Sequence, residues 1–251
     1  MKKYYPILVI LLSLISNGLQ AQNWKDLKLR NQIFELHNVT GSIERINGKK
    51  AIRIERDLQA IPFDLNNLQA TVDEAHYAKL IDLYDFENGI IEVELLSQLQ
   101  NPLPYDGVAG FIGVYFRIAQ DDSEFEGIYL RPKAAMSKDQ WIRNHSVQYI
   151  SYPNYKFDDL RKLKEFKYEG SAPIVMNEWI KMKLVINGEE ATLYIDDIKH
   201  EVFSVDKLLG KNQKGSIGLY VDIGTIGYFR NLKVQKKSLI KTSRGSTVWG
   251  I

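Results

Sequence analysis

Short runs of alternating apolar and polar residues make up most of the chain between Phe34 and Val234. Because successive side chains of a β-strand point to opposite faces, such runs predict strands with one apolar face. The clearest runs lie between Phe111 and Ser151 and read FIGVYFRIAQ, GIYLRP and HSVQYIS. We expect three strands here, each with an apolar face and a face that carries Tyr, Arg or Gln.

If these three strands are neighbours in a sheet, their polar faces converge on one surface. The residues that would form this surface are Tyr115, Arg117, Tyr129, Arg131 and Gln148. Tyrosine can stack on the C–H face of a sugar and hydrogen-bond its hydroxyls, while arginine offers five donors in a fixed arrangement. His145 opens the third strand and is a candidate for the rim of the site. The alternative is an outer sheet face on which long side chains cover their neighbours.

The same alternation predicts strands in the rest of the chain. Residues 34–37, 42–46 and 51–56 predict a three-stranded meander, and Pro62 limits a strand at residues 60–65 to a sheet edge. Further predicted strands are 78–83, 89–97, 179–187, 191–196, 200–205, 215–221 and 228–234, and residues 160–167 predict one or two helical turns. This pattern predicts an all-β fold of two antiparallel sheets packed face to face, in one domain of residues 22–235.

The first 21 residues have the pattern of a secretory signal peptide. Lys2 and Lys3 precede a short apolar run at residues 7–15, and Ala21 suits the small-residue requirement of a cleavage site. An uncleaved anchor is the alternative, but the run is too short to cross a hydrocarbon core of about 30 Å. We expect an exported protein, periplasmic or extracellular, with no membrane span in the mature chain.

Composition narrows the chemistry further. The 251 residues include 33 Lys and Arg against 31 Asp and Glu, and without Lys2 and Lys3 the two numbers are equal. This balance predicts no nucleic-acid partner, since such a partner needs clustered positive charge. The absence of cysteine removes disulfides, thiolate metal sites and a cysteine nucleophile. Residues 236–251 are basic and rich in serine, and they predict a mobile tail.

Several motifs follow one another along the chain: FENGIIEVELL, GFIGVYFR, NEWIKMKLVINGEEATLYIDD and GSIGLYVDIGTIGYFRNLKV. In this order they resemble the concanavalin A-like lectin/glucanase superfamily. Within it, the chain looks like secreted bacterial domains grouped with 3-keto-disaccharide hydrolases and laminin-G-like modules. The resemblance implies a jelly-roll sandwich whose curved sheet holds a carbohydrate on its concave face. These are mainly motifs of the fold, so they support the architecture more than an activity.

Glu92 and Glu94 are the candidates for catalytic carboxylates. They alternate along one strand, as the catalytic carboxylates of lectin-fold glucanases do, although Val93 and Leu95 interrupt that family's acidic pattern. A pair of solvent-facing residues is the commoner explanation. Trp141 and the aromatic residues of 152–155 lie in loops around the predicted face, where they serve either as sugar platforms or as loop anchors.

The sequence predicts no metal site. No two of its four histidines have metal-ligand spacing. The carboxylates on a predicted hairpin could hold Ca²⁺, which takes six to eight oxygen ligands, but a solvated hairpin tip is the simpler interpretation. They are Asp121, Asp122, Glu124 and Glu126, and the same alternatives hold for Asp196, Asp197 and Asp222.

Carbohydrate binding on the Arg/Tyr/Gln face is therefore the first hypothesis for function. The alternative is a glycoside hydrolase or related glycan-cleaving enzyme with a carboxylate on the same face, and a second alternative is an adhesion module. Two well-placed carboxyl groups in the groove, one of them with a perturbed pKa, would favour the enzyme. Aromatic residues and arginine without an acid pair would favour binding.

Overall fold

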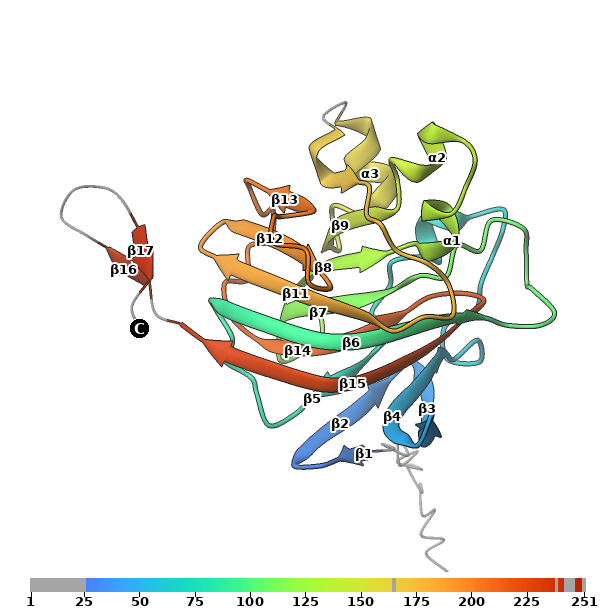
Figure 1. Cartoon of the computed structure of the whole chain (residues 1–251), viewed down its shortest axis with the longest axis horizontal. Coiled ribbons are helices and arrows are strands. Elements are labelled where there is room, and N and C mark those ends of the chain that lie inside the picture. The colour runs from blue at the N-terminus through green and yellow to red at the C-terminus, as the bar shows by residue number, and fades with distance from the viewer. Residues whose placement is uncertain (1–25, 164–165, 238, 242–246, 250–251) are drawn as a thin grey trace, which may run out of the picture.

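Two antiparallel sheets packed face to face form the body of the protein (Figure 1), which confirms the predicted jelly-roll sandwich. The computed structural model describes residues 26–163, 166–237, 239–241 and 247–249. The predicted signal peptide, residues 1–21, lies outside these ranges.

The eight-stranded sheet has the order β1-β2-β5-β14-β7-β8-β9-β10, and the seven-stranded sheet has the order β13-β12-β11-β6-β15-β4-β3. The strands of the first sheet are β1 (Asp26–Leu29), β2 (Gln32–His37), β5 (Tyr77–Leu80), β14 (Ser216–Val221), β7 (Ile112–Ile118), β8 (Phe125–Leu130), β9 (Val147–Tyr152) and β10 (Glu169–Gly170). Those of the second are β13 (Phe203–Val205), β12 (Glu190–Ile195), β11 (Ile180–Asn187), β6 (Gly89–Leu99), β15 (Thr225–Lys236), β4 (Lys49–Arg56) and β3 (Val39–Ile46).

Helices are few and short among the described residues. They are α1 (Pro132–Ala135), α2 (Gln140–Arg143) and α3 (Phe157–Lys162), with 3₁₀ turns at Leu68–Ala70 and Phe166–Tyr168. The three α-helices gather at one end of the molecule, next to β8 and β9 (Figure 1). None of the helices in the described ranges is long and apolar enough to cross a membrane.

The apolar faces of both sheets meet in one core, as alternation requires. Val114, Ile128 and Val147 of the first sheet and Val93 and Leu184 of the second are fully or almost fully buried there. The strands predicted between Phe111 and Ser151 are therefore neighbours, since β7 pairs with β8 and β8 with β9.

Two predictions about the N-terminal part are wrong. The expected three-stranded meander is divided between the sheets: β2 belongs to the first sheet, and β3 and β4 to the second. Asn38, with φ of 53°, makes the corner between them, a conformation that asparagine tolerates better than most residues. The expected edge strand at residues 60–65 is irregular chain that joins the second sheet to the 3₁₀ turn.

At the other end, β15 continues to Lys236, and β16 (Leu239–Lys241) pairs with β17 (Thr247–Trp249). The predicted mobile tail, residues 236–251, falls partly on residues outside the described ranges and stays a prediction.

Candidate functional site

The face of the eight-stranded sheet that points away from the seven-stranded sheet carries a row of stacked aromatic rings. Tyr115 lies between Phe125 and Tyr220, with ring centroids 4.5 and 4.3 Å away. Tyr129 lies 5.2 Å from Tyr220, and Phe125 stacks on Tyr152 at 4.7 Å. Because these residues come from four strands, the face is a continuous aromatic floor.

Gly127 allows this stacking. A Cβ atom at Gly127 would lie 2.3 Å from Cδ1 of Tyr115, so only a residue without a side chain lets the Tyr115 ring lie against β8.

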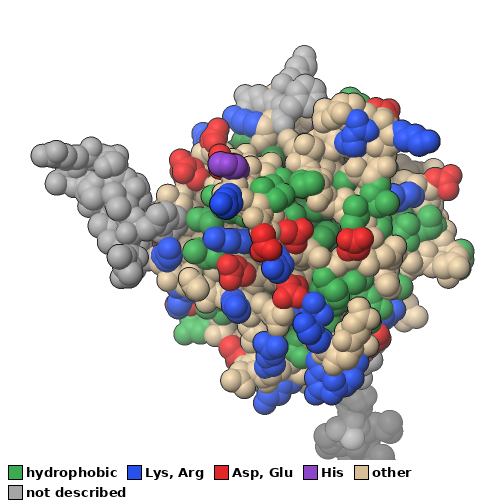
Figure 2. Space-filling model, in the orientation of Figure 1, with side chains coloured by type: hydrophobic (Ala, Val, Ile, Leu, Met, Phe, Trp, Pro, Cys, Tyr) green, Lys and Arg blue, Asp and Glu red, His purple; other side chains and the backbone are tan. Residues whose placement is uncertain are grey.

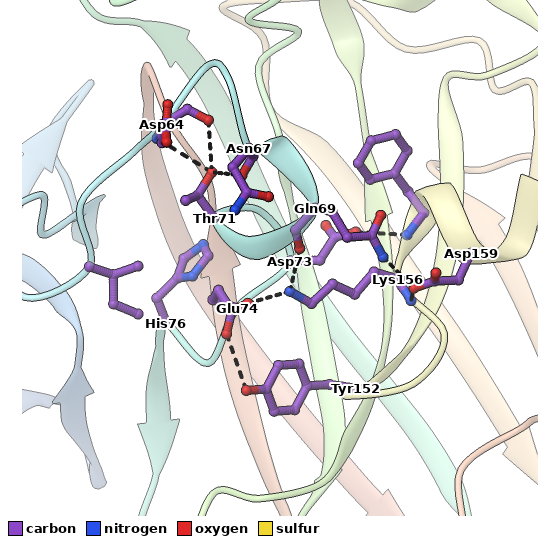
Figure 3. A network of polar contacts seen from close by, with 12 residues as sticks. Asp64, Asn67, Gln69, Thr71, Asp73, Glu74, His76, Tyr152, Lys156 and Asp159 are labelled. Atoms are coloured by element: carbon purple, nitrogen blue, oxygen red, sulfur yellow. Dashed lines mark hydrogen bonds and ion pairs between the residues drawn. The ribbon is translucent and has the colours of Figure 1, made fainter.

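A covering segment, residues 57–76, reaches the floor at Asp73, which lies 3.4 Å from the Tyr220 hydroxyl. Polar contacts join this segment to helix α3 (Figure 3). Lys156 forms an ion pair with Glu74 and donates to the carbonyl of Gln69 at 2.8 Å. The side-chain amide of Gln69 donates to Asp159 of α3 at 2.7 Å. Tyr152, from the floor, donates to Glu74 at 3.1 Å. The covering segment is therefore tied both to α3 and to the sheet.

A cavity of about 300 Å³ lies next to these contacts between the covering segment and α3. Its wall is mainly apolar and includes the aromatic residues Tyr105, Phe111, Tyr129, Trp141 and Phe157. Its polar side chains are Asp73, Arg131, His145, Arg161 and Asp222. A mostly apolar hollow with a few converging polar groups is the usual form of a small-molecule site.

Arg131 makes four hydrogen bonds through its two terminal nitrogens. Its Nη1 donates to the carbonyl of His145 at 2.9 Å and to Glu169 at 3.0 Å. Its Nη2 donates to the Tyr129 hydroxyl at 3.1 Å and to Gln148 at 2.9 Å. Its buried Nε–H has no hydrogen-bond partner in the described part of the chain. A buried donor without a partner is costly.

Two buried carboxyl groups, Asp73 and Asp222, also line the cavity. The Tyr220 hydroxyl lies between them, 3.4 Å from Asp73 Oδ1 and 3.0 Å from Asp222 Oδ2. Arg56 donates to Asp222 at 2.7 Å, and the His76 ring approaches it to 3.4 Å.

Their surroundings move the two pKa values in opposite directions. Burial raises the pKa of Asp73, and the negative charge of Asp222 adds to the effect despite a hydrogen bond from the Phe157 N–H. Burial alone would raise the pKa of Asp222 as well, but the His76 ring and the Arg56 guanidinium hold it well below its usual value. The pair therefore combines a carboxyl that is harder to ionise than usual with one that is easier to ionise than usual.

The predicted ligand-binding residues are divided among several places. Tyr129, Arg131 and His145 line the cavity. Gln148 is fully buried and holds Arg131 from the side, and Tyr115 is fully buried in the aromatic floor.

Arg117 does not share the face of Tyr115, so this part of the alternation prediction is wrong. Arg117 has φ of 53°, and the pairing of β7 with β14 shifts register beside it. This bulge turns its side chain toward Glu126, at 3.1 Å, and toward the carbonyl of Gly188, at 2.7 Å. It is 1% exposed, and its donors are occupied by the protein itself.

Glu92 and Glu94 lie on β6, in the other sheet, and their side chains face away from the core. Burial alone would raise the pKa of Glu94, but hydrogen bonds from Asn231 and Arg230 lower it instead. Acidic and basic side chains are mixed over this sheet (Figure 2), as on a solvated surface. The two glutamates are therefore not on the face that carries the cavity.

The hairpin carboxylates proposed for Ca²⁺ point to different partners. Asp121 accepts from Ser123, and Glu126 pairs with Arg117. Asp122 lies near Glu35 and His37, a grouping that could hold a metal ion among the described residues. However, the Lys79 ammonium is 2.8 Å from Asp122 and already supplies a positive charge there.

Sequence reasoning missed several residues of the cavity. Asp73 lies in a segment without periodicity, and Phe157 and Arg161 lie on a helix that no pattern connected with the sheet. Asp222 comes directly after β14, two residues from Tyr220, and this position is the one sequence feature that places it near the aromatic floor.

No protein-family model matches the sequence, and neither does any curated protein. Among solved structures, the chain is similar to the carbohydrate-binding module CBM66 from Bacillus subtilis, with 16% identity and a TM-score of 0.42, over 78% of this chain and 94% of the module. A Bacillus subtilis protein of unknown function with a galectin-like fold has 11% identity and a TM-score of 0.45, over 79% and 88%. The VIP36 exoplasmic/lumenal domain, in its Ca²⁺/Man3GlcNAc-bound form, has 12% identity and a TM-score of 0.43, over 82% and 85%.

At such identities and TM-scores, the likeness says nothing about the ligand of the present chain.

Proposed function

We propose that this protein binds carbohydrate in the cavity above the eight-stranded sheet. The observation that carries the proposal is that five aromatic side chains and the Arg131 guanidinium line the same cavity. A sugar offers apolar C–H faces to Tyr129 or Phe157 and hydroxyl groups to the polar side chains that line the cavity. Gln148 and Glu169 hold the guanidinium in place, so little side-chain entropy is lost on binding.

The test is a calorimetric binding screen of neutral glycans with the purified protein and two cavity variants. Arg131→Lys keeps the charge but loses the forked donor group, and Ala134→Phe fills the cavity from α1 while leaving its polar groups in place. We expect both to lose at least about tenfold in affinity, which corresponds to about 1.4 kcal/mol. Glu92→Ala, on the opposite sheet, is the matched control and should bind as the wild type does.

Circular dichroism and melting temperature establish that each variant is folded. Saturable binding that survives both cavity variants in folded protein would place the ligand elsewhere and reject the proposal.

By the criterion given for the sequence, the carboxyl pair Asp73 and Asp222 favours a second candidate, a glycan-cleaving hydrolase that uses the same cavity. We place binding first because both carboxyl groups are almost fully buried and bonded to groups of the protein, Asp222 to Arg56 and Asp73 to the Phe157 N–H. Asp73, with its raised pKa, would donate a proton to the leaving oxygen of a glycosidic bond, while ionised Asp222 would stabilise positive charge on the sugar ring. Water would then add its hydroxyl to the anomeric carbon and return a proton to Asp73.

Chromatography of glycans incubated with the protein tests this second function. Asp73→Asn resembles the neutral acid in shape, so it should keep binding and abolish release of sugar. Wild-type protein that binds a glycan and releases no product from it would reject the hydrolase and leave the binding function standing.

We also propose that the protein is exported, since residues 1–21 have the composition of a signal peptide. Fractionation of the host, followed by N-terminal sequencing, tests this, with a new N-terminus at Gln22 as the expected result.

A further inference from the structure

A second hollow, of about 460 Å³, adjoins the cavity. It is lined by Asn144, Glu169, Gly170 and Ser171, and it shares Trp141 and His145 with the cavity. The two spaces therefore meet at one tryptophan and one histidine.

Trp141 is 61% exposed, unusual for a residue type that is mostly buried, yet it is held in position. Its backbone N–H donates to Asp139, the N-cap of α2, at 2.8 Å. The His145 ring lies 4.2 Å from the Trp141 ring, and His145 Nδ1 contacts the Trp141 carbonyl. The Arg161 guanidinium also lies over the Trp141 ring, 6.0 Å from its centroid. The exposed part of this indole, between the two hollows, offers a stacking surface to a ligand that occupies both.

Polar groups also connect the two hollows. Glu169 lines the second hollow, while its carboxylate is fixed by Arg131 at 3.0 Å and by Arg161 at 2.7 Å, and both arginines line the cavity. A movement of Glu169 in the second hollow would therefore change the positions of Arg131 and Arg161 in the cavity. The cavity, at about 300 Å³, is at the small end of ligand sites. It suits one sugar ring and leaves the next ring outside it.

We propose that the two hollows are successive subsites for the end of a glycan chain, with the terminal sugar in the cavity and the next sugar stacked on Trp141 in the second hollow. This inference rests on the proposed carbohydrate-binding function. It adds that the ligand is an oligosaccharide or the end of a polysaccharide, rather than a free monosaccharide or the middle of a chain.

Calorimetry with D-glucose, D-mannose, D-galactose and L-arabinose, and with their di- and trisaccharides, tests the two subsites. For a sugar that binds, we expect the disaccharide to bind at least about tenfold more tightly than the monosaccharide. Ser171→Trp, at an exposed position of the second hollow, should reduce the disaccharide to the affinity of the monosaccharide and leave the monosaccharide unchanged. Trp141→Ala should weaken the disaccharide more than the monosaccharide.

Partial hydrolysis of a bound polysaccharide tests recognition of the chain end, since the number of binding sites per mass of glycan should rise with the number of ends. If a monosaccharide binds but the disaccharide gains nothing, or if Ser171→Trp has no effect on it, the subsites are rejected and the proposed function stands. If no member of the series binds, both are rejected.

Discussion

At the scale of single residues, the opposed surroundings of Asp73 and Asp222 predict opposite effects of pH on stability. The native pKa of Asp222 lies below its ordinary value of 3.8, so the stability it contributes is present above about pH 4 and is lost as the pH falls below it. The native pKa of Asp73 lies above 3.8, so stability declines as the pH rises through that raised value.

Urea unfolding of the wild type, Asp222→Asn and Asp73→Asn across the acid range measures these slopes. Asp222→Asn should flatten the loss of stability toward low pH, although its overall stability is lower because Arg56 and His76 lose their partner. Asp73→Asn should remove the decline toward higher pH. Two variants whose slopes both match the wild type would contradict the opposed pKa shifts.

At the scale of elements, Gly127 on β8 is predicted to be required for the aromatic floor. Gly127→Ala places a methyl group against the Tyr115 ring, and overpacking of this kind costs about 1–3 kcal/mol of unfolding free energy. A double-mutant cycle with Tyr115→Ala checks the cause. With the ring removed, Gly127→Ala should cost much less, whereas strictly additive effects would mean that the Tyr115 ring is not the obstacle.

The fastening of the covering segment to α3 gives a second prediction about elements. Lys156→Met removes the ion pair with Glu74 and the bond to the Gln69 carbonyl, so residues 57–76 should exchange amide hydrogens faster while the two sheets do not. Lys162→Met is the matched control on the same helix, since its ion pair with Asp158 is exposed. Equal exchange in the two variants would show that Lys156 does not hold the segment.

Strands β7, β8 and β9 were predictable because a period of two is visible in a single run of sequence. The grouping of Tyr129, Arg131 and Gln148 follows from the same period. The site was less predictable because its other walls come from chain without periodicity. Nothing local in the residues around Asp73 indicates that they fold back over Tyr220. The neighbouring Glu74 pairs with Lys156, which is far along the chain. The bulge at Arg117 breaks the period at a single residue, which a pattern over several residues cannot reveal.

At the scale of the whole molecule, Arg117 joins the two sheets and should act on stability alone. It extends from β7 of the first sheet to the carbonyls of Glu87, beside β6, and Gly188, between β11 and β12 of the second. Arg117 also forms an ion pair with Glu126. Burial raises the pKa of the Glu126 carboxyl. Arg117→Met therefore leaves a buried carboxylate unpaired, and we expect it to lower the unfolding free energy by about 3–5 kcal/mol.

Glycan affinity should be unchanged in Arg117→Met at a temperature where the protein is folded, in contrast to Arg131→Lys, which should bind poorly. Adding Glu126→Gln to Arg117→Met removes the unpaired charge and should recover part of the lost stability. Unfolding curves and calorimetry on the same samples separate the two effects. If Arg117→Met instead weakened binding without loss of stability, Arg117 would belong to the binding site, and the division between an arginine that joins the sheets and an arginine that holds the ligand would fail.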